Sequence, residues 1–216
     1  MWIFFCLGFD YFDFYLLHVD DVSVSVEEVV STMEEIQKSG KIRYYGCSNW
    51  TVARQKEAAA FAKAHGMSGF RVDEVEMNLA RINRSNETCI SKWLDDEFIA
   101  HHKVSGMAVG AYSPVASGVL AKLAEDGNTE RWSAGQKSWY DLPYNHEVAH
   151  RLKKLSEETG YTMMQLQLAY VLSQPHGFSN FAISGSATLE QLVENMEALQ
   201  IEMTPDMIDF LHLKER

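Results

Sequence analysis

The chain has 216 residues, of which 46% are hydrophobic, and this is enough to bury one sizeable core. Its net charge is −11 without any basic cluster, which argues against nucleic acid and anionic membranes as partners. Three widely spaced cysteines, Cys6, Cys47 and Cys89, are typical of a reducing compartment. The apolar start MWIFFCLGF is too short to span a bilayer and lacks the features of a signal peptide. We therefore expect a cytoplasmic protein.

Short β-rich runs alternate with helical patterns along the chain. The β-rich runs occupy residues 12–18, 41–49, 70–78, 107–114 and 181–185. The helical patterns cover residues 25–40, 51–66, 90–101, 147–158 and the stretches that follow Thr162, Thr188 and Thr204. Residues 118–144 are rich in glycine, serine and asparagine, and we expect a long surface loop there. The alternation predicts parallel β/α architecture in one domain over residues 1–216.

Capping signals mark four of the predicted helix starts: Ser25-x-x-Glu28, Thr162-x-x-Gln165, Thr188-x-x-Gln191 and Thr204-Pro205. A serine or threonine at such a position accepts a hydrogen bond from the backbone three residues later, and a proline suits the first helical position. These signals place the predicted helices between the β-rich runs.

Polar side chains follow the predicted strands, where functional residues of β/α barrels lie. They are His18, Ser48, Asn49, Glu74, Glu76, Asn78, Tyr112, Ser113 and Ser186. Serine and asparagine are ordinary turn formers, and a histidine beside apolar residues is usually a hydrogen-bonded structural residue. Five successive strand ends with the same feature nevertheless indicate a site along one rim.

Five stretches, DYFDFYLLH, GKIRYYGCSNWT, AYSPVASGVL, LQLAYVLSQP and SGSATLEQLVENMEAL, resemble the fourth to eighth β/α units of the aldo-keto reductases in order and spacing. The resemblance runs from about Leu7 to the C-terminus. It implies an α/β fold, an incomplete TIM-type (β/α)8 barrel with about five parallel strands and outer helices. It also implies an oxidoreductase that transfers hydride between NAD(P)H and an aldehyde or ketone.

The resemblance also assigns roles to residues. It makes His18 the catalytic histidine that orients the substrate carbonyl, and Ser48 with Asn49 the pair that binds the nicotinamide carboxamide. Glu74 stands where the family usually has a glutamine, and a carboxylate can only accept hydrogen bonds. The remaining cofactor contacts implied by the resemblance are Tyr112 against the nicotinamide ring, Ser113, Val115 and Ser117 along the pyrophosphate, and Ser186, Gln191, Glu194 and Asn195 at the adenosine end. The expected cofactor is NADP(H), with NAD(H) as the alternative because Gly185 and Gln191 replace the basic residues of many relatives.

The family's proton donor, a tyrosine tuned by a lysine and an aspartate, belongs to the first three β/α units. Nothing before Leu7 matches them, and the first lysine is Lys38. We therefore expect about 90 to 100 residues to be missing at the N-terminus, at about 30 per unit, and the chain alone to be inactive. Open strand edges beside MWIFFC then favour self-association. The alternative is a non-catalytic nucleotide-binding or subunit-interaction protein derived from the family.

A second motif indicates different chemistry. Residues 146–150 read H-E-x-x-H, the signature of zinc proteases. On a helix, Val148, Leu152 and Leu155 form the buried stripe, whereas His146 and His150 point to the opposite side. A catalytic zinc needs a shielded cleft and a third ligand, and no matching downstream motif follows. We expect no metal site, and a metal hydrolase is the last alternative.

Overall fold

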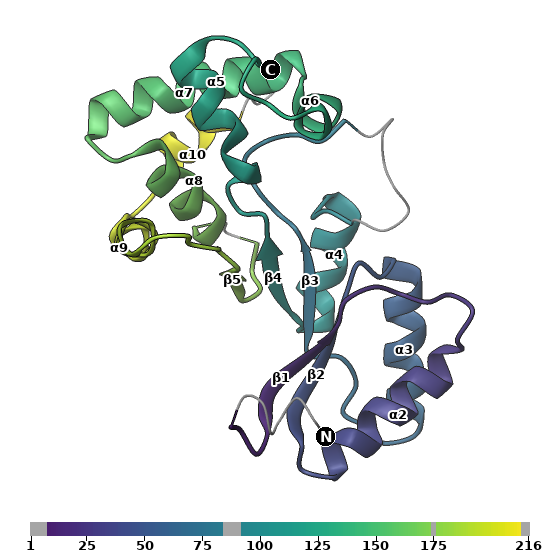
Figure 1. Cartoon of the computed structure of the whole chain (residues 1–216). Helices are drawn as coiled ribbons and strands as arrows, with labels where there is room; N and C mark the ends of the chain where they lie inside the picture. The colour runs from purple at the N-terminus through teal and green to yellow at the C-terminus, as the bar shows by residue number, and fades with distance from the viewer. Residues whose placement is uncertain (1–7, 84–91, 174–175, 213–216) are drawn as a thin grey trace. The chain divides into compact units, whose positions relative to one another are not determined.

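The computed structural model describes residues 8–83, 92–173 and 176–212 (Figure 1). Its strands are β1 (Phe12–Leu17), β2 (Ile42–Ser48), β3 (Val72–Glu76), β4 (Ala108–Tyr112) and β5 (Asn180–Ala182). Its helices are α2 (Val26–Lys38), α3 (Val52–Ala64), α4 (Asp96–Ser105), η2 (Ala116–Gly118), α5 (Val119–Asp126), α6 (Ala134–Tyr140), α7 (Pro143–Thr159), α8 (Met163–Leu172), α9 (Leu189–Glu197), η3 (Ala198–Gln200) and α10 (Pro205–Leu211).

The strands form one sheet in the order β1-β2-β3-β4-β5. Strand β1 pairs with β2 in parallel, with Leu17 opposite Cys47, and β2 pairs with β3 in parallel, with Ser48 opposite Glu74. The order follows the chain because each strand is followed by a helical connection that returns the chain to the same end of the sheet. The predicted α/β fold of five parallel strands with surrounding helices is confirmed.

The chain divides into two compact units, and the division crosses β3, β4 and β5. The first unit comprises Met1–Val75, Ile90–Gly110 and His176–Asn180. The second comprises Glu76–Cys89, Ala111–Pro175 and Phe181–Arg216.

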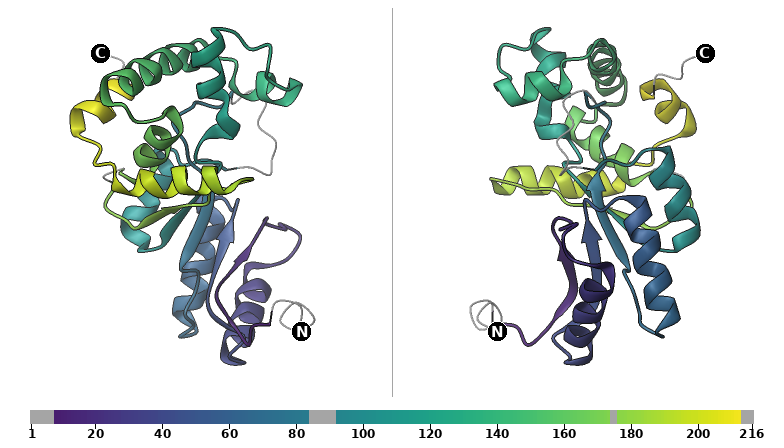
Figure 2. Two further views of the ribbon diagram at one scale, coloured as in Figure 1. Left: turned by 60° about the vertical axis from the view of Figure 1, so that its left-hand side comes forward. Right: turned by 90° about the vertical axis from the view of Figure 1, so that its right-hand side faces the viewer.

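Helices α2 and α3 cover one side of the first unit (Figures 1 and 2). Ser25 is the N-cap of helix α2, and its side chain accepts from Glu28 N as predicted; the helix buries Val30 and Met33. Its core partners include Tyr45 of β2 and Trp50, which are 0% and 1% exposed. The helical spacing of the apolar side chains thus directs them against the sheet.

The helix predicted at residues 90–101 is found in the first unit as α4, with both ends shifted toward the C-terminus. It begins at Asp96, after an N-cap at Asp95 whose carboxylate accepts from Glu97 N and Phe98 N, and it ends before Gly106 in the left-handed conformation. Residues 84–91 lie outside the described part of the chain. The Asp95 cap sets the start, because it satisfies backbone N–H groups that have no partner within the helix.

The predicted loop at residues 118–144 is wrong. The second unit contains helices α5 and α6 there, α7 already begins at Pro143, and α5 packs against α7. Helix α5 buries Val119, Leu120 and Leu123 on one side. Helix α6 begins with a capping box between Ser133 and Gln136. The glycine and serine residues that suggested a continuous loop lie largely at helix ends. Gly127, for example, ends α5 in the left-handed conformation.

The remaining elements of the second unit follow the prediction with shifted ends. Helix α8 has the predicted capping box between Thr162 and Gln165, and α10 begins at Pro205 after an N-cap at Thr204. Strand β5 is shorter than expected and ends at Ala182. In the described part of the chain, none of the helices combines the length and hydropathy needed to cross a membrane.

Candidate functional site

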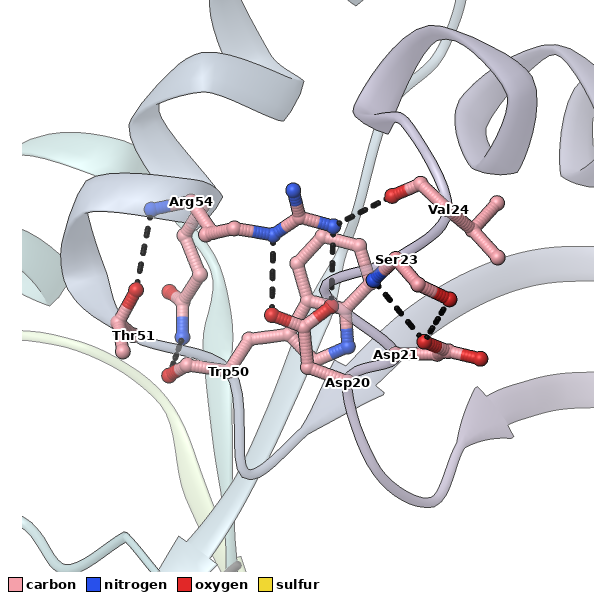
Figure 3. A network of polar contacts seen from close by, with 8 residues as sticks. Asp20, Asp21, Ser23, Val24, Trp50, Thr51 and Arg54 are labelled. Atoms are coloured by element: carbon pink, nitrogen blue, oxygen red, sulfur yellow. Dashed lines mark hydrogen bonds and ion pairs between the residues drawn. The ribbon is translucent and has the colours of Figure 1, made fainter. Parts of the chain in front are cut away.

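A polar network fixes the two loops that follow β1 and β2 in the first unit (Figure 3). The guanidinium of Arg54 donates to both carboxylate oxygens of Asp20, at 2.9 and 3.1 Å, and to the carbonyl oxygen of Val24 at 3.1 Å. It also lies over the ring of Trp50, 5.0 Å from the ring centre. Arg54 stands in the first turn of α3, so the segment that follows His18 is tied to the segment that follows Asn49.

His18, Ser48, Asn49 and Glu74 come together at the ends of these strands. Asn49 Nδ2 donates to the carbonyl oxygen of His18 at 3.2 Å and to Ser48 Oγ at 3.0 Å. Ser48 Oγ donates to the carbonyl oxygen of Glu74 at 2.8 Å. The backbone N–H of Lys92 donates to Asn49 Oδ1 at 3.0 Å. The sheet register and these bonds place four of the predicted site residues in one cluster.

The four residues differ in their exposure and strain. Ser48 and Asn49 are 1% and 8% exposed, whereas the imidazole of His18 is exposed and Glu74 is half-buried. Asn49 has a φ of 60°, in the left-handed region that asparagine tolerates better than most residues. The buried pair therefore shapes the strand ends, and His18 and Glu74 are the more accessible members of the cluster.

Glu74 has an altered acidity. Burial raises the pKa of its carboxyl above the ordinary value, the positive charge of His18 opposes this, and the Asp73 carboxylate raises the pKa further. A protonated carboxyl has both a donor and an acceptor, as an amide does, whereas a carboxylate only accepts. The raised pKa of Glu74 widens the pH range in which its carboxyl is protonated and can donate as the glutamine expected at this position would.

A buried polar group supports β3 in the first unit. The carboxylate of Asp73, 0% exposed, lies 2.8 Å from Gln55 Nε2, 3.1 Å from His102 Nε2 and 3.5 Å from Cys47 Sγ. Burial and the Asp73 carboxylate raise the pKa of the Cys47 thiol well above its usual range. The sequence reasoning missed this group, because its members come from four separate elements and match no short motif.

In the second unit, the segment after β4 has an unusual backbone. Ser113, Ala116 and Ser117 have φ values of 51°, 46° and 54°. Non-glycine residues pay on the order of 1 kcal/mol each for this conformation, which is frequent in ligand-binding loops. Asn78 Nδ2 donates to the carbonyl oxygen of Ser113 at 3.2 Å and Gln136 Nε2 to that of Ser117 at 3.4 Å. Tyr112 and Val115 of the predicted cofactor contacts are half-buried here.

A buried tyrosine that the sequence reasoning missed lies beside this segment. Tyr140 donates to Glu76 Oε1 at 2.5 Å, and Asn78 Nδ2 donates to the same oxygen at 3.2 Å. Burial raises the pKa of Glu76, and burial together with the Glu76 charge raises that of Tyr140. Asn145, 0% exposed, bonds the backbone of Arg81 and the carbonyl oxygen of Tyr140. The Ser133–Gln136 capping box was the signal for the helix that carries Tyr140.

Part of the predicted adenosine group is assembled around the start of α9. Asn195 Nδ2 donates to Ser186 Oγ at 2.9 Å and to Ser184 Oγ at 3.0 Å. Gln191 Oε1 accepts from Ala187 N at 2.7 Å. The carboxylate of Glu194 instead accepts from Thr162 Oγ1 at the start of α8. The structure thus brings Ser186, Gln191 and Asn195 to one loop and directs Glu194 elsewhere.

The H-E-x-x-H residues lie on α7 as the helix geometry predicted. Val148, Leu152 and Leu155 are buried, while the three motif side chains are exposed. His146 Nε2 lies 2.9 Å from Asp141 Oδ1, and Glu147 accepts from Arg151. An open pocket of about 550 Å³ borders Asp141, Pro143, His146 and Glu147. Across residues 8–83, 92–173 and 176–212, no three histidine, cysteine or acidic side chains are grouped closely enough to hold a metal ion.

Comparison with known proteins fits this geometry. The model of the Aldo/keto reductase family matches residues 6–213. The chain belongs to this family. A solved structure of a thermostable aldo-keto reductase, Tm1743, has a TM-score of 0.71 at 24% identity, and the match covers 97% of this chain and 62% of that one. The likeness supports the predicted TIM-type fold class.

The curated proteins that are similar to this chain have different named functions. A probable voltage-gated potassium channel subunit beta of Oryza sativa subsp. japonica is 29% identical over 212 residues, which is 94% of this chain and 61% of the relative. An aryl-alcohol dehydrogenase [NADP(+)] of Phanerodontia chrysosporium is 24% identical over 216 residues, 94% of this chain and 51% of the relative. The chain thus spans between about half and three-fifths of the length of these relatives.

Proposed function

We propose that the chain binds a nicotinamide dinucleotide at its strand ends. We further propose that it belongs to an oxidoreductase that transfers hydride between NAD(P)H and an aldehyde or ketone. The observation that carries the proposal is the cluster of His18, Ser48, Asn49 and Glu74 at three adjoining strand ends. Family membership and the NADP(+) in the name of the Phanerodontia chrysosporium relative support it. NADP(H) is the proposed cofactor, with NAD(H) as the alternative.

The residues present divide the task between them. His18, whose imidazole is exposed, orients the substrate carbonyl. In the first unit, Ser48, Asn49 and Glu74 are the proposed contacts of the nicotinamide carboxamide. In the second unit, Tyr112 is the proposed aromatic contact of the nicotinamide ring. Because Ser48 and Asn49 already hydrogen-bond within the chain, a carboxamide must share or replace those bonds. Dinucleotide binding is therefore weak. In the second unit, Ser186 and Asn195 with Gln191 hold the adenosine end.

Proton donation is the step that the described residues support least. A tyrosine that donates a proton near neutral pH needs a lowered pKa. Burial instead raises the pKa of Tyr140 and of Tyr170, and that of Tyr45 in the first unit. We therefore propose that the 216 residues alone turn substrate over slowly or not at all.

The second candidate is a non-catalytic nucleotide-binding or subunit-interaction protein. Three relatives with 27–29% identity are named as voltage-gated potassium channel beta subunits. Dinucleotide binding without carbonyl reduction would select this candidate over the first.

The test is a titration of NADPH fluorescence with the purified chain. Weak but saturable binding is expected, and Tyr112→Ala should weaken it several-fold because the ring stacking is lost. The matched control is Tyr161→Ala, since Tyr161 is 41% exposed and lies between α7 and α8, outside the proposed contacts. Equal loss in both variants, or binding indifferent to Tyr112, would show that the dinucleotide binds elsewhere.

A further inference from the structure

The segment 113–117 after β4 is held by side chains at both of its ends. Gln136 Nε2 of α6 donates to the carbonyl oxygen of Ser117 at 3.4 Å. Asn78 Nδ2, from the loop after β3, donates to the carbonyl oxygen of Ser113 at 3.2 Å. All of these residues belong to the second unit. Two side chains of that unit therefore bind the backbone of the first and the last residue of the segment.

A buried carboxylate orients the side chain of Asn78. Asn78 Nδ2 also donates to Glu76 Oε1 at 3.2 Å, and the hydroxyl of Tyr140 donates to the same oxygen at 2.5 Å. Because the Glu76 carboxylate and the Ser113 carbonyl group are both acceptors, the amide has to present its NH2 group to them. Its oxygen, Asn78 Oδ1, is buried without a hydrogen-bond partner among the described residues. The two contacts of Nδ2 therefore decide how the amide lies.

Tyr140 is itself fixed from two sides. Tyr140 and Glu76 are 8% and 6% exposed, so their hydrogen bond is shielded from water. Asn145, in the first turn of α7, donates to the carbonyl oxygen of Tyr140 at 2.7 Å and to that of Arg81 at 2.8 Å. A buried carboxylate needs donors because burial penalises its charge. The Tyr140 hydroxyl therefore stabilises the Glu76 oxygen that orients Asn78.

The segment that these bonds hold has a costly backbone conformation. Ser113, Ala116 and Ser117 have positive φ values although none of them is a glycine. Such residues keep this conformation only where surrounding contacts hold them. Val115, with a φ of −116°, precedes Ala116, and such a change of sign turns successive N–H groups toward one side, where they can bind an anion. The conformation that suits an anion is therefore the one that needs support.

We propose that Tyr140 is a positioning residue for the pyrophosphate of the dinucleotide. Its hydroxyl, acting through Glu76 and Asn78, holds the Ser113 end of the segment, while Gln136 holds the other end. The inference rests on the proposed dinucleotide site. It assigns to α6 and the loop after β3 a role that needs no contact with the dinucleotide itself.

Hydrogen exchange of the full chain, followed by mass spectrometry, tests the positioning without a ligand. Tyr140→Phe removes the hydroxyl and retains the ring. It should accelerate exchange in the segment several-fold, including that of Ala116 N, which donates to the carbonyl oxygen of Ser113 at 2.9 Å. The matched control is Tyr170→Phe, since Tyr170 is 7% exposed and lies on α8. Circular dichroism verifies that both variants retain the fold.

Gln136→Glu tests the other end of the segment and keeps the proposal open to refutation if Tyr140→Phe does not fold. A glutamate still accepts from Ser133 N in the capping box, but its carboxylate cannot donate to the carbonyl oxygen of Ser117. Faster exchange of the segment is expected in this variant as well. Exchange as slow as in the wild type would overturn the positioning.

Titration of NADPH fluorescence tests the link to the dinucleotide. Tyr140→Phe should weaken binding roughly tenfold, because the apparent affinity falls with the fraction of molecules whose segment is ordered. Glu76→Gln should lose less, since it keeps an oxygen that accepts from Tyr140 and Asn78. Adenosine 2′-monophosphate carries the adenosine end without the pyrophosphate. Measured by displacement of NADPH, it should bind equally to the wild type and to Tyr140→Phe.

The outcomes separate this role from the proposed function. A wild type that does not bind NADPH refutes the proposed function and the role of Tyr140 with it. Faster exchange in Tyr140→Phe with unchanged NADPH affinity refutes only the role of Tyr140 in dinucleotide binding. An equal loss of affinity for NADPH and for adenosine 2′-monophosphate would show a general effect on the fold and would also overturn it.

Discussion

The guanidinium of Arg54 holds the carboxylate of Asp20 through two hydrogen bonds, Nε to Oδ2 at 2.9 Å and Nη2 to Oδ1 at 3.1 Å. Both side chains are largely buried, 18% and 7% exposed. This pair connects the loop that carries His18 to the helix that follows Asn49. The stability of the proposed site should therefore depend on it.

Arg54→Ala is expected to lower the stability of the chain by roughly 2–3 kcal/mol, because it leaves Asp20 without its partner. Arg54→Lys should lose less, since it keeps the charge without the paired geometry. Thermal unfolding followed by circular dichroism measures both. The control is Arg43→Ala, which removes the exposed pair with Asp13 and should cost less than about 1 kcal/mol. Equal losses at the two sites would contradict the role of the Arg54 pair.

The pKa of Glu74 predicts a pH dependence of stability. Because the folded-state pKa lies above the ordinary value of 4.5, the folded chain binds the proton more tightly than the unfolded chain. The stabilisation is complete below the unfolded-state pKa and is lost as the pH rises through the folded-state pKa. Glu74→Gln should therefore raise the melting temperature at neutral pH and change it little near pH 4. An equal change in melting temperature at both pH values would show that ionisation of Glu74 is not the cause.

The same substitution should affect the dinucleotide. Glu74→Gln replaces a carboxyl group that is ionised at high pH with a neutral amide. The variant should therefore bind NADPH several-fold more tightly than the wild type at neutral pH. For the wild type, binding should strengthen as the pH falls through the Glu74 pKa. Fluorescence titration across pH gives both curves. A wild type and a variant with the same pH profile would place Glu74 outside the binding site.

Gly46 of β2 is required by close packing of the strands. A Cβ at this position lies 2.2 Å from the carbonyl oxygen of Val72 and 2.7 Å from Leu16 Cδ2. Since the backbone of β3 cannot give way easily, Gly46→Ala should lower the stability by roughly 3 kcal/mol. Gly135→Ala is the control, because its nearest neighbour is Ser133 Oγ at 3.8 Å and it lies in α6. That variant should lose no stability, and a similar loss in both would refute the steric explanation.

Carbonyl reduction by the chain alone should be undetectable or very slow. A positioned general acid typically contributes about 10²- to 10⁴-fold to the rate, and burial raises the pKa of Tyr140 and Tyr170 instead of lowering it. NADPH oxidation with a simple aldehyde is the measurement. Robust turnover that His18→Ala abolishes would show that another residue donates the proton.

The sequence by itself determined the strands, most helix starts and the family. These depend on local patterns: apolar runs, capping residues such as Ser25 and Thr162, and motifs at strand ends, all of which act over a few residues. The parallel register then follows from the alternation of strands and helices. The predicted neighbours His18, Ser48, Asn49 and Glu74 meet for this reason.

Two features could be learned only from the tertiary structure. One is that helices form in a segment whose composition is typical of a loop, and the other is which side of an amphipathic helix is exposed. Helix α5 forms within the predicted loop because its apolar side packs in the second unit, and Tyr140 is buried against Glu76. The Thr188 cap predicted α9, but its spacing did not predict that the apolar side of α9 is exposed while Asn195 and Glu197 hydrogen-bond to the loop after β5 and to α8. Such bonds join residues far apart in the chain, and no local pattern contains them.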